Sequence, residues 1–397
     1  MENKSYSYSS ILLISRVLYI SFSLQCFIDI GPKILILFCI WLLSELFLNS
    51  KNFFRVLKYR HYTYLFFFLV YLFIALLSSS PSVINNIVAF CSVISPLLMY
   101  DLCAIENNKR VRFIINVYTL VCVFNCLFSL YFMKSYGLIN LRTYSSISNL
   151  SERFYLLRNS FQFTSGLSLI VPIYVYLFVH NDWKDRVKIK AIFLLLIIVF
   201  AYTVISAQFL TAILIMLFGS LIALMYENKK RLFVGFILAS SALFVLPTII
   251  IALNDSNKDY SVIVTRLEEI NMTITGQGEE TNDMDARNNL FLNSFNTFIS
   301  NPIFGISVYK SSNLTNKEIG NHASWIDLLA RYGLFAFLLF SMMYLHIKRQ
   351  MRIYRLALIP FLFFVIGFLN PLWFFHTMSV VFFYSPLLLR IATTSKR

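Results

Sequence analysis

Apolar runs about as long as a membrane-spanning helix follow one another along the chain, separated by shorter polar gaps. A helix needs about 20 mostly apolar residues to cross the hydrocarbon layer of a bilayer. The residue-by-residue alternation expected of barrel strands is absent from these runs. The pattern therefore predicts an all-α integral membrane protein with about 12 transmembrane helices. The expected spans begin near residues 9, 34, 62, 83, 113, 160, 191, 208, 232, 330, 356 and 373.

Composition agrees with this pattern. Of the 397 residues, 58% are hydrophobic and only 13% are charged, and the mean hydropathy is +0.70. A water-soluble domain could not bury so much apolar surface in its core. The first run, about Ser9 to Phe27, carries Arg16 and lacks a small-residue cleavage site, so it is interpreted as a retained helix. We expect residues 1–397 to form one polytopic membrane domain.

The formal net charge of +15 would suggest nucleic-acid binding in a soluble protein. Here, however, the basic residues concentrate in every second gap, which is the positive-inside pattern of a membrane protein. This pattern predicts that both termini are cytoplasmic, and it argues against a nucleic-acid partner. The basic gaps contain Lys51, Arg55, Lys58 and Arg60; Lys109, Arg110 and Arg112; Lys184, Arg186, Lys188 and Lys190; Lys229, Lys230 and Arg231; and Lys348, Arg349, Arg352 and Arg355.

Two of the alternate, outward gaps are long enough to hold a site. Residues 134–158 form a moderate basic loop, and residues 253–321 form a large loop before the tenth span. In ARNNLFLNSFNTFI, within the large loop, apolar residues recur at three- and four-residue spacing. This spacing predicts an amphipathic helix that either lies on the membrane surface or packs over the bundle. Asn301-Pro302 should end that helix, and Gly305 should permit the turn that follows.

The outward loops also collect arginines, which positive-inside bias disfavours there. Arginine binds phosphate bidentately through a planar group that stays charged. As a set, these arginines favour a diphosphate ligand at the membrane surface. The alternative is that each pairs with a nearby acid among Glu152, Glu268, Glu269, Asp283 and Asp285. The outward arginines are Arg142, Arg153, Arg158, Arg266 and Arg287.

His322 stands at the end of the large loop, at the threshold of the tenth span. Its reference pKa of about 6.5 suits a general base near neutral pH. Asp327 and Arg331 follow with i, i+4 spacing, so in a helix they share one face and can pair. The alternative for His322 is a structural role at the interface. His61, His180 and His346 are interpreted as interfacial residues at cytoplasmic ends, and His376 lies near the outer end of the last two spans.

Few ionisable residues are expected in mid-membrane, which argues against a proton-coupled carrier. Arg16 should snorkel toward the cytoplasmic face, and Glu45 is interpreted as an interfacial residue or a partner for Arg16. The six cysteines lack metal-binding spacing and are interpreted as small core residues. No HExxH, GxSxG or phosphate-loop motif occurs in the chain. We therefore expect no metal and no cofactor.

Taken in order, the expected spans, the large outer loop, the segment ARNNLFLNSFNTFISNPIFGIS and the following NHASWIDLLARYGLFAF resemble the bacterial O-antigen polymerase and O-antigen ligase superfamily. The resemblance covers the whole chain in topology but only about residues 285–337 closely. The matching positions are Arg287, Asn301-Pro302-Ile303-Phe304-Gly305, His322 and Gly333. One departure is Ala323, because ligases usually have a small polar residue after the histidine. A second is Ser206-Ala207-Gln208, where ligases have a polar or basic residue after the serine.

The resemblance implies a glycosyltransferase of the bacterial inner membrane with its active face in the periplasm. The donor would be a glycan on undecaprenyl diphosphate, and the acceptor would be a hydroxyl of a lipid-linked repeat unit. Arg287, Arg266, Arg158, Arg153, Arg142 and Arg331 would bind diphosphate or glycan. His322 would activate the acceptor with Asp327 as its partner, without metal or nucleotide sugar. A chain-length regulator is a further candidate partner.

Within the family, the string HASWIDLLARYGL and the basic loop at 134–158 favour the polymerase. Two alternatives remain open. An O-antigen ligase would transfer the glycan to lipid A core, and it shares the main motifs with the polymerase. A lipid-linked glycan flippase or transporter would instead predict polar residues lining a path through mid-membrane.

Overall fold

The structure is a computed structural model that describes residues 2–24, 34–77, 83–135, 160–180, 187–225, 282–308, 318–320, 322–353, 358–370 and 375–394. Within these ranges every regular element is a helix. The elements are α1 (Glu2–Leu24), α2 (Ile34–Leu48), α3 (Ser50–Val56), η2 (Leu57–His61), α4 (Tyr62–Leu77), α5 (Val83–Ala104), α6 (Asn108–Ser135), α10 (Ser160–His180), α11 (Val187–Ser206), α12 (Leu210–Met225), α15 (Asn282–Ser300), η4 (Ile306–Val308), α16 (Ser324–Ile353), α17 (Leu358–Leu369), α18 (Phe375–Ser379), η5 (Val380–Tyr384) and α19 (Ser385–Thr394).

The helices follow the apolar runs of the sequence. A helix covers each expected span except the one near residue 232, which lies outside the described residues. Local signals set some of the ends: the Asn107 side chain accepts the Arg110 backbone N–H at 3.0 Å and so caps α6. Pro96 and Pro172 lie inside α5 and α10. Membrane helices tolerate such prolines because neighbouring helices can satisfy the freed backbone groups.

Four helical segments of the described residues are long and apolar enough to cross a membrane: Asn108–Ser135, Phe161–His180, Lys188–Ser206 and Phe375–Ala392. Two bent pairs, Ile34–Leu48 with Ser50–Val56 and Ser324–Phe335 with Phe337–Met351, raise that number to six if each pair is one span. The chain is thus a helical membrane protein. The count of 12 spans stays a prediction.

Burial separates central from peripheral helices. In the most apolar window of each candidate span, 83% of Phe375–Ala392 and 72% of Phe161–His180 are buried, against 17% of Lys188–Ser206. α10 therefore lies near the centre, where it packs against α11, α12, α17 and α18. Large apolar side chains on α2, α4 and α11 are exposed at the periphery. In water such a surface would be a liability, whereas acyl chains cover it without penalty.

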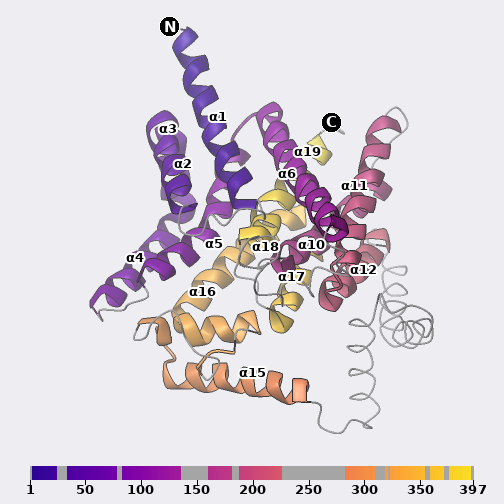
Figure 1. Ribbon diagram of the computed structural model, residues 1–397. Coiled ribbons are helices and arrows are strands. Elements are labelled where there is room, and N and C mark those ends of the chain that lie inside the picture. Colours follow the sequence, from indigo (N-terminus) through magenta and orange to yellow (C-terminus); the bar gives the residue numbers. More distant parts are fainter. Residues whose placement is uncertain are drawn as a thin grey trace, which may run out of the picture.

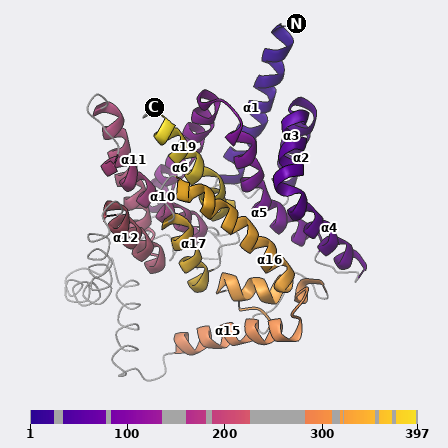
Figure 2. The ribbon, with the colours of Figure 1, turned by 180° about the vertical axis from the view of Figure 1, so that it is seen from behind.

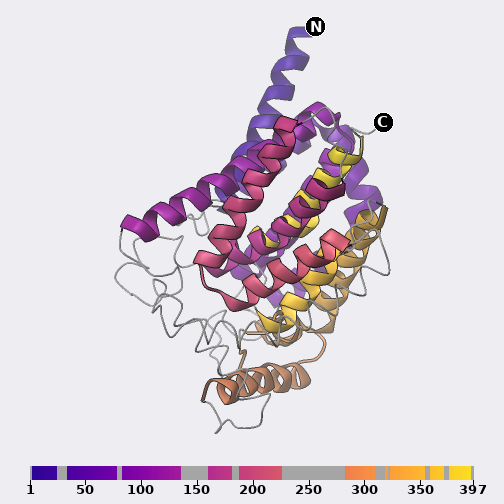
Figure 3. The same cartoon turned by 90° about the vertical axis from the view of Figure 1, so that its right-hand side faces the viewer.

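The two ends of the bundle differ (Figures 1 and 2). α1 begins and α19 ends at one end, and α15 lies across the opposite end. The view in Figure 3 shows the same arrangement, with α15 beneath the tilted bundle helices. α15 packs against α16 and ends at Ser300, directly before Asn301-Pro302. The segment with amphipathic spacing is therefore a helix packed over the end of the bundle.

Candidate functional site

The central feature of the α15 end is a break in α16. Gly333 has φ 68° and ψ −174°, outside the helical region. The two halves of α16, Ser324–Phe335 and Phe337–Met351, meet at 109°. Such a break leaves backbone N–H groups without helical partners. The turn after α15 satisfies two of them: Leu334 N–H donates to the Pro302 carbonyl at 2.9 Å, and Phe335 N–H donates to the Ile303 carbonyl at 3.4 Å.

Two glycines make this contact possible. A Cβ atom at Gly305 would overlap the Arg331 carbonyl, and one at Gly333 would overlap the Ile303 carbonyl. Both glycines also have positive φ, 70° and 68°, which side chains of L-residues disfavour. The turn at 301–305 and the break at 333 therefore fit backbone to backbone. The Asn-Pro-x-x-Gly motif and the glycine after the histidine form one structural unit, which we call the helix-break unit (the described part of residues 294–335).

A buried polar cluster fixes the loop that precedes α16. Ser294 Oγ, on α15, donates to Asp327 Oδ1 at 2.5 Å and accepts the Gly320 N–H at 2.8 Å. Asp327 Oδ2 accepts the Ala323 N–H at 3.0 Å. Ser294 and Asp327 are both buried. The backbone is thus tied down on each side of His322, through Gly320 before it and Ala323 after it.

His322 itself is exposed. Further support comes from the next residues, since Ser324 Oγ donates to the Asn370 carbonyl at 2.8 Å and Trp325 Nε1 donates to the Phe364 carbonyl at 2.7 Å. These bonds join the start of α16 to α17. An exposed imidazole on a backbone that is held by several hydrogen bonds is well suited to proton transfer with a docked ligand, because little conformational freedom is lost when the ligand binds.

The other predicted site residues have different outcomes. Asp327 is a positioning residue in the sense that its carboxylate holds Ser294 and the backbone of Ala323. Arg331, one turn further on, is partly buried beside the break. Arg287 lies on α15, but its side chain is outside what the structure describes. Arg142, Arg153, Arg158 and Arg266 also lie outside the described residues, together with most of the loops at 134–158 and 253–321.

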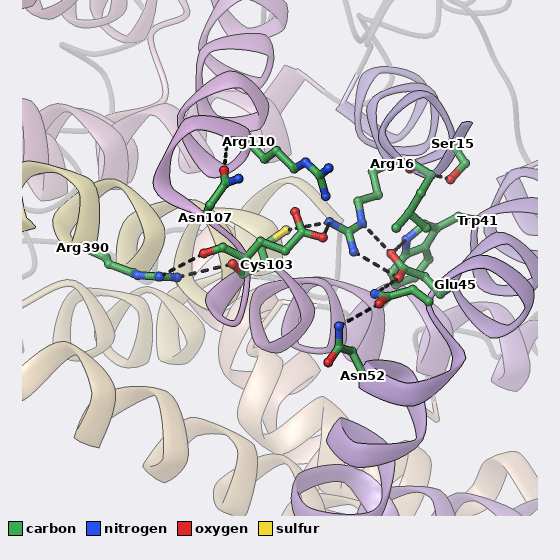
Figure 4. Close-up of polar contacts among 12 residues, drawn as sticks. Ser15, Arg16, Trp41, Glu45, Asn52, Cys103, Asn107, Arg110 and Arg390 are labelled. Atoms are coloured by element: carbon green, nitrogen blue, oxygen red, sulfur yellow. Dashed lines mark hydrogen bonds and ion pairs between the residues drawn. The ribbon is translucent and has the colours of Figure 1, made fainter. Parts of the chain in front are cut away.

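At the opposite end, a second cluster gathers formal charges from four parts of the chain (Figure 4). Arg16 on α1 forms a bidentate pair with Glu45 on α2, with Nε–Oε1 at 2.5 Å and Nη2–Oε2 at 3.0 Å. Arg16 Nη1 also contacts Glu106 Oε1 at 2.6 Å. Arg390 on α19 donates to the Ala104 carbonyl at 2.7 Å and so caps the end of α5. We call Arg16, Glu45, Glu106 and Arg390 the ionic cluster.

Of the two interpretations of Glu45, a partnership with Arg16 is confirmed. The expectation that Arg16 snorkels is wrong. The Arg16 side chain is 1% exposed and that of Glu45 is 0% exposed. Trp41 Nε1 and Asn49 Nδ2 add bonds to the Glu45 carboxylate at 3.1 and 3.0 Å. Neutral donors therefore bond to the Glu45 oxygens in addition to the guanidinium, and these bonds offset the cost of burying the pair.

His61 was expected at an interface and is instead buried. Its Nε2 lies 2.8 Å from Asp101 Oδ2 on α5. The sequence did not predict Asp101 as the partner of His61, because a single acid at the end of an apolar run is typical of the end of a membrane helix. His376 is also buried, with Nε2 2.9 Å from the Leu24 carbonyl at the end of α1. Of the cysteines, Cys103, Cys122 and Cys126 are buried, as expected for core residues, whereas Cys39 is exposed.

Among the described residues, no group of three or more His, Cys, Asp or Glu side chains could hold a metal ion. The helix-break unit contains the exposed His322 and the partly buried Arg331. An imidazole suits proton transfer, and a guanidinium suits anion binding. No family model matches the chain, and no curated protein matches it.

Proposed function

We propose that this protein is an O-antigen polymerase, a glycosyltransferase that joins lipid-linked repeat units into a polysaccharide. The observation that carries the proposal is the helix-break unit. The segment whose sequence resembles the polymerase and ligase superfamily folds as one interlocked piece, with Gly305 on the backbone at Arg331 and Gly333 on the backbone at Ile303. In the same unit, Ser294 and Asp327 hold the backbone on each side of the exposed His322.

In the proposed reaction, a hydroxyl of the acceptor repeat unit attacks the anomeric carbon of the donor glycan. The bond from that carbon to the diphosphate oxygen breaks, and undecaprenyl diphosphate leaves with the bonding electrons. His322 takes the proton of the attacking hydroxyl. Asp327 has a positioning role in this proposal, because its carboxylate holds the backbone of Ala323, next to His322.

Arginine side chains would stabilise the charge that develops on the departing diphosphate. Arg331 is the candidate on α16, where it precedes the break by two residues. We assign the same role to Arg287 on α15. Arg266, Arg158, Arg153 and Arg142 would extend this binding surface along the glycan, in line with the two basic outer loops of the sequence.

The proposed location is the bacterial inner membrane, with 12 spans and both termini in the cytoplasm. Support comes from two observations that agree. The basic gaps of the sequence assign the chain ends to the cytoplasmic side, and the helix-break unit lies at the end of the bundle away from the start of α1 and the end of α19 (Figure 1). His322 would then face the periplasm, where lipid-linked repeat units are joined.

The test is the lipopolysaccharide ladder of a strain that lacks this gene, complemented with the wild-type chain or with His322→Ala. We expect the wild type to restore the ladder and His322→Ala to leave core plus one repeat unit. His180→Ala is the matched control, because His180 is a partly buried histidine whose Nε2 lies 3.1 Å from the Ala223 carbonyl, away from the helix-break unit.

The alternatives give different bands. Bare core with accumulated lipid-linked polymer would identify a ligase. Loss of repeat units from the outer side of the membrane would identify a flippase. An unchanged ladder in the deletion strain would exclude polymerase and ligase alike.

A further inference from the structure

α15 presents three different faces. A helix that only packed on α16 would need two, one toward the protein and one toward water. The inward face carries Ser294, already bonded to Asp327, and Thr297, whose Oγ1 donates to the Glu318 carbonyl at 2.5 Å. Phe298 packs on the small cluster formed by Ile306, Ile319 and Ala330. This face holds α15 against the helix-break unit and accounts for its position.

From Phe291 onward, the second face is apolar and exposed. Phe291, Phe295 and Ile299 repeat every four residues and are 45%, 41% and 60% exposed, with Leu292 beside them at 50%. The third face carries the exposed polar residues Asn289, Asn296 and Ser300. Because successive helical residues are about 100° apart, the apolar and polar flanks lie on different sides of the inward face. A helix that met only water would have no use for the apolar flank.

The apolar flank continues into a surface that faces lipid. Ile303, 61% exposed, follows α15, and its carbonyl accepts the Phe335 N–H of α16. From there the exposed residues Leu334, Leu338 and Met342 run from the break into the second half of α16, again four residues apart. That half belongs to a bent pair apolar enough to cross a membrane, so its exposed stripe faces acyl chains.

We infer that the α15 flank formed by Phe291, Leu292, Phe295 and Ile299 docks on the surface of the lipid bilayer. The partner is the boundary between acyl chains and headgroups. The exposed residues Leu334, Leu338 and Met342 of α16 identify this partner, because one apolar surface extends from the membrane-crossing half of α16 across Ile303 onto α15. α15 is then an interfacial helix, with its inward face on the helix-break unit, its apolar flank in lipid and its polar flank in water.

This inference goes beyond the proposed function and does not depend on it. An interfacial α15 would fix the height of the helix-break unit at the membrane surface, whatever reaction takes place there. Packing on α16 alone would leave four large apolar side chains in water.

The test is the accessibility of a nitroxide spin label in proteoliposomes, measured on a chain whose six cysteines are replaced by serine. Phe295→Cys reports the apolar flank, Asn296→Cys is the adjacent control on the polar flank, and Leu338→Cys is the lipid-facing reference. We expect the label at 295 to be relaxed by oxygen several-fold more than by a water-soluble nickel chelate, as at 338. The label at 296 should show the reverse.

Two results would overturn the inference. If the labels at 295 and 296 respond equally to the nickel chelate, the flank lies in water. If the label at 295 is immobile and shielded from both reagents, a protein surface covers it, either another segment or a second copy. A lipid contact requires high oxygen accessibility together with low nickel accessibility.

A second measurement covers the case in which the cysteine-free chain does not fold. Phe295→p-benzoylphenylalanine in the chain with its native cysteines, irradiated in native membranes, should yield phospholipid adducts detectable by mass spectrometry. The same replacement at Asn296 should yield at least several-fold fewer. Exclusive protein–protein adducts at 295 would contradict docking on lipid.

Discussion

The helix-break unit and the ionic cluster use ionisable residues in opposite ways. In the ionic cluster the Arg16 guanidinium and the Glu45 carboxylate are enclosed and neutralise each other. In the helix-break unit the connections are mostly backbone hydrogen bonds and glycine contacts, and His322 is left exposed. The type of a residue therefore does not reveal its role. Charges that build the fold are buried in pairs, whereas a side chain that meets a ligand must remain accessible.

The largest expected effect on stability comes from breaking the ionic cluster. Glu45→Ala leaves the Arg16 guanidinium buried with a single acidic partner, and removing one member of a buried pair costs about 3–5 kcal/mol. We expect a much lower midpoint of thermal unfolding in detergent and a reduced amount of protein in membranes. Glu106→Gln is the control, since Glu106 is more exposed and glutamine keeps an acceptor oxygen for Arg16. Equal losses in the two variants would contradict the central role of the Arg16–Glu45 pair.

A smaller but still large effect is expected at the break in α16. Gly333→Ala places a Cβ against the Ile303 carbonyl at φ 68° and ψ −174°, a region that is essentially restricted to glycine and costs other residues about 1–3 kcal/mol. The turn at 301–305 should separate from α16. We therefore expect a lower midpoint of thermal unfolding and a weaker lipopolysaccharide ladder. Gly166→Ala is the control, because a Cβ there meets only ordinary contacts, the nearest at 3.7 Å. Full function of Gly333→Ala would show that the break is not needed.

Ser294→Ala tests the polar connection between α15 and the loop that carries His322. The change leaves one oxygen of Asp327 and the Gly320 N–H without this buried partner, which should cost about 1–3 kcal/mol. Ser300→Ala on the same helix is the matched control, since its Oγ donates to the Asn296 carbonyl at an exposed position. Thermal unfolding of the two variants in detergent should differ clearly. Equal midpoints would mean that Ser294 does not hold the loop.

The sequence predicted the helices well because apolar length and polar gaps are local signals. It also offered a partnership of Arg16 with Glu45 as one of two interpretations of Glu45, and the structure shows that pair. It could not give the burial of Arg16, whose guanidinium also contacts Glu106, nor the capping of α5 by Arg390. The residues that supply these contacts are far apart in the chain.

The helix-break unit likewise depends on contacts between segments far apart in the chain. RYGLFAF looks like part of an uninterrupted apolar helix, so the break at Gly333 became visible only with the turn at 301–305 packed on it. Asp327 was predicted to share a helix face with Arg331 and to be able to pair with it. Its carboxylate bonds to Ser294, 33 residues earlier, and to the Ala323 N–H, and neither bond could be predicted from the sequence. Nothing in the sequence distinguishes Ser294 from the other serines and threonines of that helix.

The smallest expected effect on stability is at His322, and there the comparison is sharpest. Because His322 is exposed, His322→Ala should change the free energy of unfolding by no more than about 0.5 kcal/mol while abolishing the ladder. His61→Ala makes the same chemical change at a buried histidine bonded to Asp101, and it should lower the unfolding midpoint because it leaves a buried carboxylate short of a partner. A stable but inactive His322→Ala would separate a ligand-facing histidine from a fold-building one. A lower unfolding midpoint for His322→Ala would mean that His322 stabilises the fold, as the residues of the ionic cluster do.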